Sequence, residues 1–338
     1  MEDIPSSLDW IECRQIQLYF YNRCMDKARR NIGGMSVVVL WLGFISTATL
    51  RAQQGNITTL HVTTRLVAVS AVVTEKNGEP HAGLTKDDFI LKQDGREQSI
   101  RYLSQGDQLP LTFVVMIDTS GSQFSFLGDE QRACDVFFET VMGRAQDRAV
   151  LVEVNREVIA RSNLTNSAND LHLALYGLNS NRTERTATRL TDAIYTVSKS
   201  VLAKVTGRKA IILLSDGGEN GSVVKREEAI AEAQRDNVPV YSISYSAWNG
   251  FRSPNSADPG LANLQDWSKA TGGHVYEVSY SMPLKRIFEN IAEELRSQYE
   301  IGYMLPADTK PGAFHKLELK TKNKQLKVQA RTGFYVAP

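Results

Sequence analysis

The sequence predicts an α/β domain with a doubly wound, mostly parallel sheet that is inserted into a small antiparallel β-sandwich. Continuous apolar runs, such as 113–117 and 210–214, alternate with segments of helical composition, which is typical of parallel strands covered by helices on both faces. Shorter stretches with partial alternation flank this region, at 59–106 and 298–338. Neither flank is long enough for a stable core of its own, so we expect the two flanks to pack together.

Two segments precede the expected domains. A basic cluster at 27–30 comes before the apolar run 37–45, and small and polar residues follow it. This order is typical of a secretory signal peptide over 25–52, with an uncleaved membrane anchor as the alternative, because the uncharged stretch is about 20 residues long. Leaders start shortly before their basic cluster, so we expect translation to begin at Met25 and residues 1–24 to be a non-native extension. The protein is then secreted or located in the periplasm or cell envelope.

Charge and cysteine content exclude several classes of function. The 338 residues include 39 basic and 38 acidic side chains, for a formal charge of +1, so no overall field attracts nucleic acid. Cys13, Cys24 and Cys134 lack the spacing of a metal site, and they do not suggest a disulfide framework.

The N-terminal flank, 59–106, is expected to form about four antiparallel strands. The dipeptides Asn77-Gly78 and Asp94-Gly95 are hairpin turn signals within it. The C-terminal flank alternates apolar and charged residues, which indicates half-exposed strands. Its expected strands are 299–303, 316–320, 326–330 and 333–336.

The α/β region, 107–297, carries five expected strands and six expected helices in alternation. The strands are 113–117, 149–154, 210–214, 238–243 and 273–278. The helices are 131–142, 168–176, 190–202, 227–235, 261–270 and an amphipathic last helix that follows Pro283. In this last helix apolar residues recur at spacings of three and four up to Leu295.

Polar residues follow two of the apolar strands, at the sheet edge where α/β proteins bind ligands. The sequence DTSGS stands at 118–122, after the first strand, and SDGG stands at 215–218, after a later one. The loop before the helix 190–202 offers Thr186 and Thr188. Because the carboxyl ends of parallel strands meet at one edge, we expect these groups to lie close together.

The chemistry of these groups predicts a site for a hard divalent cation. Two carboxylates and three hydroxyls are all oxygen donors, which Mg²⁺ accepts together with water, and no histidine or cysteine competes for zinc. Mn²⁺ and Ca²⁺ are alternatives. The expected ligands are Asp118, Ser120, Ser122, Thr188 and Asp216. Such a set neutralises at most two charges, so the cation keeps an open position suited to an Asp or Glu carboxylate of a partner protein.

This pattern resembles the metal-ion-dependent adhesion site (MIDAS) of von Willebrand factor type A (VWA) domains, over about 111–297. The resemblance implies a VWA, Rossmann-like fold and binding of a protein ligand rather than catalysis. The segments 84–95, 297–303 and 331–335 are similar to the bacterial VWFA-related family described from acidobacteria, which implies an exported bacterial protein. That family usually has glycine before the metal-binding threonine, whereas Ala187 stands here, so Thr186 is the alternative to Thr188.

Three functions therefore compete. A phosphatase of the haloacid dehalogenase type would need aspartate where Ser120 stands, and the sequence contains neither a phosphate-binding loop nor a nucleophile elbow. Metal-assisted hydrolysis needs a general base that the sequence does not offer. A cell-envelope scaffold with a vestigial metal site is the other alternative. We therefore expect a non-enzymatic, adhesion-type protein.

Overall fold

The computed structural model describes residues 66–105, 109–142, 144–178, 187–245 and 258–336. The expected leader at 25–52, the extension at 1–24 and the alternative ligand Thr186 lie outside these residues. Within the described ranges, no helix combines the length and apolar character that crossing a bilayer requires.

A six-stranded sheet forms the centre of the α/β region, with the strand order β10-β9-β8-β5-β6-β7. All neighbouring strands are parallel except β6 and β7, which pair antiparallel. The strands are β5 (Leu111–Asp118), β6 (Arg148–Val154), β7 (Val158–Ala160), β8 (Arg208–Leu214), β9 (Val240–Ser244) and β10 (Val275–Glu277). The expected mostly parallel sheet is therefore confirmed, with β7 as an additional strand.

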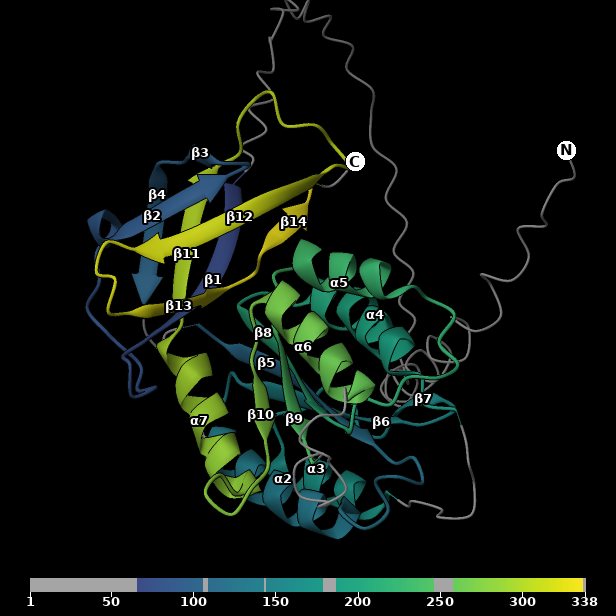
Figure 1. Cartoon of the computed structure of the whole chain (residues 1–338). Helices are drawn as coiled ribbons and strands as arrows, with labels where there is room; N and C mark the ends of the chain where they lie inside the picture. The colour runs from purple at the N-terminus through teal and green to yellow at the C-terminus, as the bar shows by residue number, and fades with distance from the viewer. Residues whose placement is uncertain (1–65, 106–108, 143, 179–186, 246–257, 337–338) are drawn as a thin grey trace, which may run out of the picture. The chain divides into compact units, whose positions relative to one another are not determined.

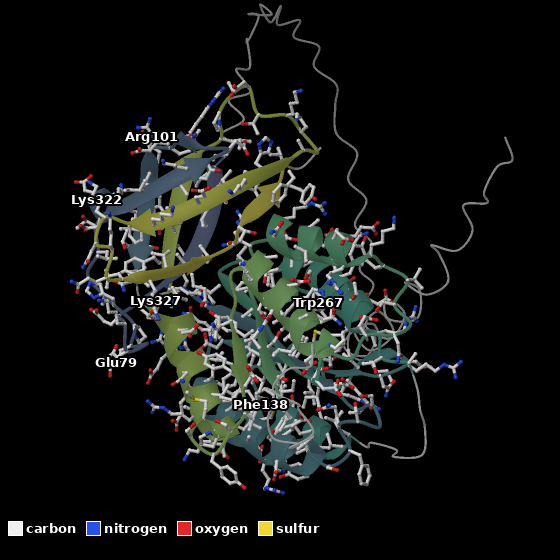
Figure 2. All side chains as sticks on the ribbon, viewed as in Figure 1. Glu79, Arg101, Phe138, Trp267, Lys322 and Lys327 are labelled. Carbon is white, nitrogen blue, oxygen red and sulfur yellow. The ribbon has the colours of Figure 1, made fainter. Side chains whose placement is uncertain are left out.

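Helices cover both faces of this sheet, which is why β5, β6 and β8 contain runs of apolar residues. On one face lie α2 (Leu127–Val141), α3 (Ala168–Tyr176) and α7 (Leu284–Ser297). On the other lie α4 (Leu190–Ser200), η2 (Leu202–Lys204), α5 (Arg226–Arg235) and α6 (Pro259–Thr271) (Figure 1). Successive β5 residues point to opposite faces: Phe113 belongs to the same core as Phe138, and Val114 to the same core as Trp267 (Figure 2).

The start and the end of α6 are encoded locally. The Asp258 carboxylate accepts the Leu261 N–H at 3.0 Å, which satisfies a donor that the first helical turn leaves open. Pro259 is the first helical residue, where its missing N–H costs nothing. Gly272 ends the helix in the left-handed conformation at φ 89°. The beginning of α6 lies beside the loop that follows β8, where the Asn263 side-chain amide donates to the Gly217 carbonyl oxygen at 2.9 Å.

Two four-stranded antiparallel sheets form the sandwich. Their strand orders are β13-β1-β11-β4 and β14-β12-β2-β3. The strands are β1 (Leu66–Thr74), β2 (Phe89–Gln93), β3 (Arg96–Glu97), β4 (Ile100–Gln105), β11 (Tyr299–Met304), β12 (Phe314–Thr321), β13 (Lys327–Ala330) and β14 (Gly333–Tyr335), and the short helix η1 (Lys86–Asp88) precedes β2. Val69, Leu91 and Ile301 are among the core residues between the sheets. Because each sheet takes strands from both flanks, the expected packing of the flanks is confirmed.

Both expected hairpin turns are present, and they differ in the length of the pairing that follows. The Asp94-Gly95 dipeptide does join β2 to β3, with φ values of 51° and 80°. At Asn77-Gly78 the chain also reverses: Thr74 bridges Pro80 antiparallel, the Glu75 N–H donates to the Glu79 carbonyl oxygen at 2.8 Å, and the His81 N–H donates to the Val73 carbonyl oxygen at 2.7 Å. This second hairpin is short. It uses the edge of β1 that β11 leaves free, because β11 pairs only with residues 66–71 and β13 lies on the other edge.

Buried polar contacts join the sandwich to the α/β region. Arg331, next to β13, is 5% exposed, and its guanidinium donates to the carbonyl oxygens of Gln234 in α5 and Ala68 in β1. Asn237, after α5, donates to Ser70 Oγ at 2.6 Å. Charge-assisted bonds to otherwise buried carbonyls resist separation, so the described residues form one compact unit.

Candidate metal centre

Asp118, the last residue of β5, is the buried centre of the candidate site. Its side chain is 0% exposed. One carboxylate oxygen accepts the Ser120 N–H at 2.9 Å, and the other accepts the Ser215 hydroxyl at 2.6 Å. The aspartate therefore orders the turn that follows β5 and connects it to the loop that follows β8.

The two serines of the DTSGS segment, 118–122, lie beside each other. Ser120 Oγ and Ser122 Oγ are 3.1 Å apart. Ser120 is buried, whereas Ser122 is exposed. The pair therefore extends from the interior of the sheet edge to its surface, as a site that binds both a cation and an outside ligand requires.

Ser215 is the residue that brings the second carboxylate to this edge. Its hydroxyl donates to Asp118 and accepts the Gly217 N–H at 2.9 Å. Asp216, which is half-buried, accepts the Gly218 N–H at 2.9 Å. The Gly217 main chain, at φ 77°, lies so close to α6 that a Cβ would be 2.1 Å from the carbonyl oxygen of Gly260. The loop of Asp216 is thus held from both sides.

Thr188 reaches the same group of loops through its main chain. Its N–H donates to the Asn220 carbonyl oxygen at 3.0 Å and to Asn220 Oδ1 at 2.8 Å, and its carbonyl accepts the Asn220 N–H at 3.0 Å. The preceding Ala187 lies against Gly221, where a Cβ would come within 2.7 Å of the Ala187 methyl. The absence of a side chain at position 221 therefore leaves space for alanine at position 187.

The electrostatics of the site are those of crowded carboxylates. Burial, with a smaller contribution from the negative charge of Asp216, raises the pKa of Asp118 to about 6 despite the hydrogen bonds from Ser215 and Ser120. Glu130 of α2 is fully buried, and burial raises its pKa well above the ordinary value, with Asp118, Asp129 and Asp216 adding repulsion. Neither carboxyl oxygen of Glu130 has a hydrogen-bond partner among the described residues.

These residues fit a hard divalent cation. The donors that reach Asp118 are a hydroxyl and a backbone amide, which orient the carboxylate without neutralising its charge. A cation beside Asp118 and Asp216 would offset both desolvation and mutual repulsion. The donor set consists of carboxylate and hydroxyl oxygens, which are the ligands that Mg²⁺ accepts.

The sequence predicted some residues of this site and missed others. The structure joins Asp118 and Ser120 directly, places Ser122 next to Ser120, and connects Asp216 through Ser215. Thr188 comes to the loop that follows Asp216, although within the described chain its hydrogen bonds run through the main chain rather than the hydroxyl. Sequence reasoning missed three contributors: Ser215, Asn220 and Glu130. A serine directly before the expected Asp216, and a carboxylate on the apolar face of α2, were available signals.

The raised pKa of Asp118 predicts how stability depends on pH in the absence of metal. Below about pH 4 the carboxyl is protonated in both the folded and the unfolded chain. As pH rises from about 4 to 6, the unfolded chain releases its proton while the folded chain retains it, so stability falls. The difference between the ordinary pKa of 3.8 and about 6 corresponds to about 3 kcal/mol.

Urea denaturation in EDTA at about pH 4 and pH 7, for wild type and Asp118→Asn, measures this effect. Because the unfolded carboxyl is already partly ionised at pH 4, the wild type should lose about 2 kcal/mol more than the variant between the two pH values. Equal losses in the two proteins would show that the folded state does not perturb Asp118.

Comparisons with known proteins identify one family and give several similar solved structures. The family model for the von Willebrand factor type A domain matches residues 113–290. No curated protein matches the sequence. Among solved structures, a von Willebrand factor type A protein from Catenulispora acidiphila is 11% identical, with 82% of this chain and 75% of that chain covered and a TM-score of 0.46.

Two other similar structures come from bacteria. An aerotolerance-related membrane protein from Bacteroides fragilis is 15% identical, with 55% of this chain and 98% of that chain covered and a TM-score of 0.42. The PilB minor pilin from Streptococcus sanguinis is 15% identical, with 56% of this chain and 62% of that chain covered and a TM-score of 0.43.

Proposed function

The chain belongs to the von Willebrand factor type A domain family, and on that premise we propose that it is a non-enzymatic protein that binds another protein through a divalent cation. Asp118, Ser120, Ser122, Thr188 and Asp216 are the proposed ligands. The observation that carries the proposal is the Ser215 hydroxyl, which joins the carboxylate at the end of β5 to the loop of Asp216. The two segments that supply four of the five ligands are therefore already assembled.

Mg²⁺ is the proposed ion, and Mn²⁺ and Ca²⁺ are the alternatives that a titration would rank. When bound, the cation supplies an electrophilic position that accepts a carboxylate. Ser122 is exposed, so the proposed partner, a protein with an exposed Asp or Glu, can approach from this side. The net charge of +1 offers no general attraction for nucleic acid.

We also propose that the protein belongs to the bacterial VWFA-related family described from acidobacteria, which it resembles in sequence. Two of the three segments that carry this resemblance, 84–95 and 297–303, meet in the sandwich: the Tyr299 hydroxyl accepts the Leu84 N–H at 3.1 Å and donates to the His81 carbonyl oxygen at 2.9 Å. This contact supports the proposed division of the chain into one β part, made of 59–106 and 298–338, around a VWA domain at 107–297.

We further propose that the protein is exported and works outside the cytoplasm or in the cell envelope. The basic and apolar order of residues 25–52 supports a signal peptide, or an uncleaved tether to the membrane. An envelope location would bring the metal site to extracellular or periplasmic protein ligands.

Capture of partners from an envelope extract tests the function. The full chain is immobilised in Mg²⁺ and then washed with EDTA, with a Ser122→Ala variant beside it. Proteins bound by wild type in Mg²⁺ should elute in EDTA, should compete with a free Asp-containing peptide, and should bind the variant less. A set of partners retained equally in EDTA and by the variant would instead favour an envelope scaffold with a vestigial metal site.

A further inference from the structure

Besides Asp118 and Glu130, a third buried carboxylate lies next to the candidate metal centre and is not one of the proposed ligands. It is Glu153 in strand β6, which is 2% exposed. One of its oxygens accepts the Thr119 hydroxyl at 2.6 Å and the Asn155 side-chain amide at 3.2 Å. The other accepts Arg161 Nε at 2.5 Å. Unlike Asp118, this carboxylate has its charge balanced by a basic side chain.

The contact with Thr119 acts on the DTSGS segment, 118–122. Thr119 stands between the two proposed ligands Asp118 and Ser120, and its N–H donates to the Val154 carbonyl oxygen at 2.9 Å. Its side chain is buried, at 4% exposure. The backbone bond sets the position of Thr119 along β6, and the bond to Glu153 sets the direction of its side chain, so the two together determine the course of the turn between the ligands.

The same group of residues also holds the loop of Thr188. Asn155 donates from its side-chain amide to Thr119 Oγ1 at 3.0 Å, and its carbonyl oxygen accepts the Arg189 N–H at 3.0 Å. Glu153 therefore lies at a junction where the segment 118–122 and the loop before α4 are tied to the end of β6. On its other side, that loop is tied to Asn220.

We propose that Glu153 is a positioning residue that preassembles the cation ligands by fixing the segment 118–122 against the loop of Thr188. This inference rests on the proposed metal-binding function. It differs from the simpler role of a buried ion pair that only stabilises the β6–β7 hairpin, because it acts on cation affinity. Groups that orient metal ligands through hydrogen bonds typically change affinity about 10- to 100-fold when removed.

The test measures Mn²⁺ binding by calorimetry on the full chain, with the free energy of unfolding in EDTA measured separately. Glu153→Gln places an amide against Arg161 and disturbs the junction. Thr119→Val removes only the hydroxyl that reaches Glu153 and leaves the Glu153–Arg161 pair in place. Both variants should bind Mn²⁺ at least about tenfold more weakly than wild type. Thr119→Val keeps the proposal falsifiable if Glu153→Gln does not fold.

Asp147→Asn is the matched control. Asp147 is 0% exposed, pairs with Arg296 at 2.5 Å, and accepts the Leu111 N–H at 2.9 Å. It therefore resembles Glu153 chemically. Asp147, however, lies where β5 and β6 begin, whereas Glu153 lies where they end. This variant should lose stability without any change in Mn²⁺ affinity.

The outcomes separate the two proposals. If wild type binds Mn²⁺ and Glu153→Gln and Thr119→Val bind it equally well, Glu153 has only a structural role and the inference is wrong. If Asp147→Asn weakens binding as much as they do, the effect reflects general destabilisation and the inference is also wrong. If wild type itself binds no Mn²⁺, the proposed function falls, and the positioning role falls with it.

Discussion

Asp118→Ala is expected to abolish the stabilisation of the protein by Mg²⁺. At a Mg²⁺ concentration of about 100 times the dissociation constant, wild type should gain about 3 kcal/mol of unfolding free energy. The variant should gain nothing, because Asp118 is the buried carboxylate around which Ser120 and Ser215 are arranged. In EDTA the two proteins should differ little: the variant loses these hydrogen bonds, but it also loses a desolvated charge.

Urea denaturation with Mg²⁺ and with EDTA measures both quantities. Ser125→Ala is a suitable control, since Ser125 is an exposed serine three positions after Ser122 and is not a proposed ligand. It should respond to Mg²⁺ as wild type does. A Mg²⁺ response that survives in Asp118→Ala would mean that the ion binds elsewhere.

Gly260→Ala is expected to destabilise the protein, although helix propensity alone predicts the opposite. Gly260 is the second residue of α6, where alanine would ordinarily add up to about 1 kcal/mol of stability. Here a Cβ would lie 2.2 Å from the carbonyl oxygen of Asp216, which is far inside van der Waals contact. The loop of Asp216 must move, so we expect a loss of about 3 kcal/mol together with weaker Mg²⁺ binding.

A matched glycine provides the control for this prediction. Gly128 is the second residue of α2, and a Cβ there would meet only the end of the Arg132 side chain, at 3.6 Å. Gly128→Ala should therefore stabilise the protein, and Mg²⁺ binding should not change. Urea denaturation of both variants decides the matter: if Gly260→Ala is as stable as Gly128→Ala, α6 does not press on the metal-site loop.

Much of the fold could be predicted because it is encoded locally. The apolar run of β5 identifies a strand that is buried on both faces. The spacing of Ile287, Ile291 and Leu295 identifies α7 as a helix that is buried on one face. The strand β7 was not predicted, because Val158–Ala160 is too short to show a pattern. The hairpin at Asn77-Gly78 was predicted from its turn, but its short length depends on which distant strands pair with β1.

The residues of the candidate site also fall into two groups, those that local spacing predicts and those that only the fold brings together. Asp118, Ser120 and Ser122 lie within one turn, so their spacing alone suggests a common site. The bond between Asp118 and Ser215 joins residues 97 positions apart in the chain, and only the sheet order that places β8 beside β5 brings them together. Glu153 and Asn220 also contact residues that are distant in the sequence, Thr119 and Thr188 respectively. No local spacing in a single sequence predicts such contacts.

The way in which the chain leaves and re-enters the sandwich determines how mechanical force would pass through the molecule. β4 ends at Gln105 before the α/β region, β11 begins at Tyr299 after it, and these two residues are directly paired. A pull on a ligand held at the metal site therefore enters the sandwich through two adjacent strands that share the load. Tension applied between β1 and β14 instead crosses the two sheets of the sandwich, and it reaches the α/β region only through the side contacts of Ser70 with Asn237 and of Arg331 with Gln234.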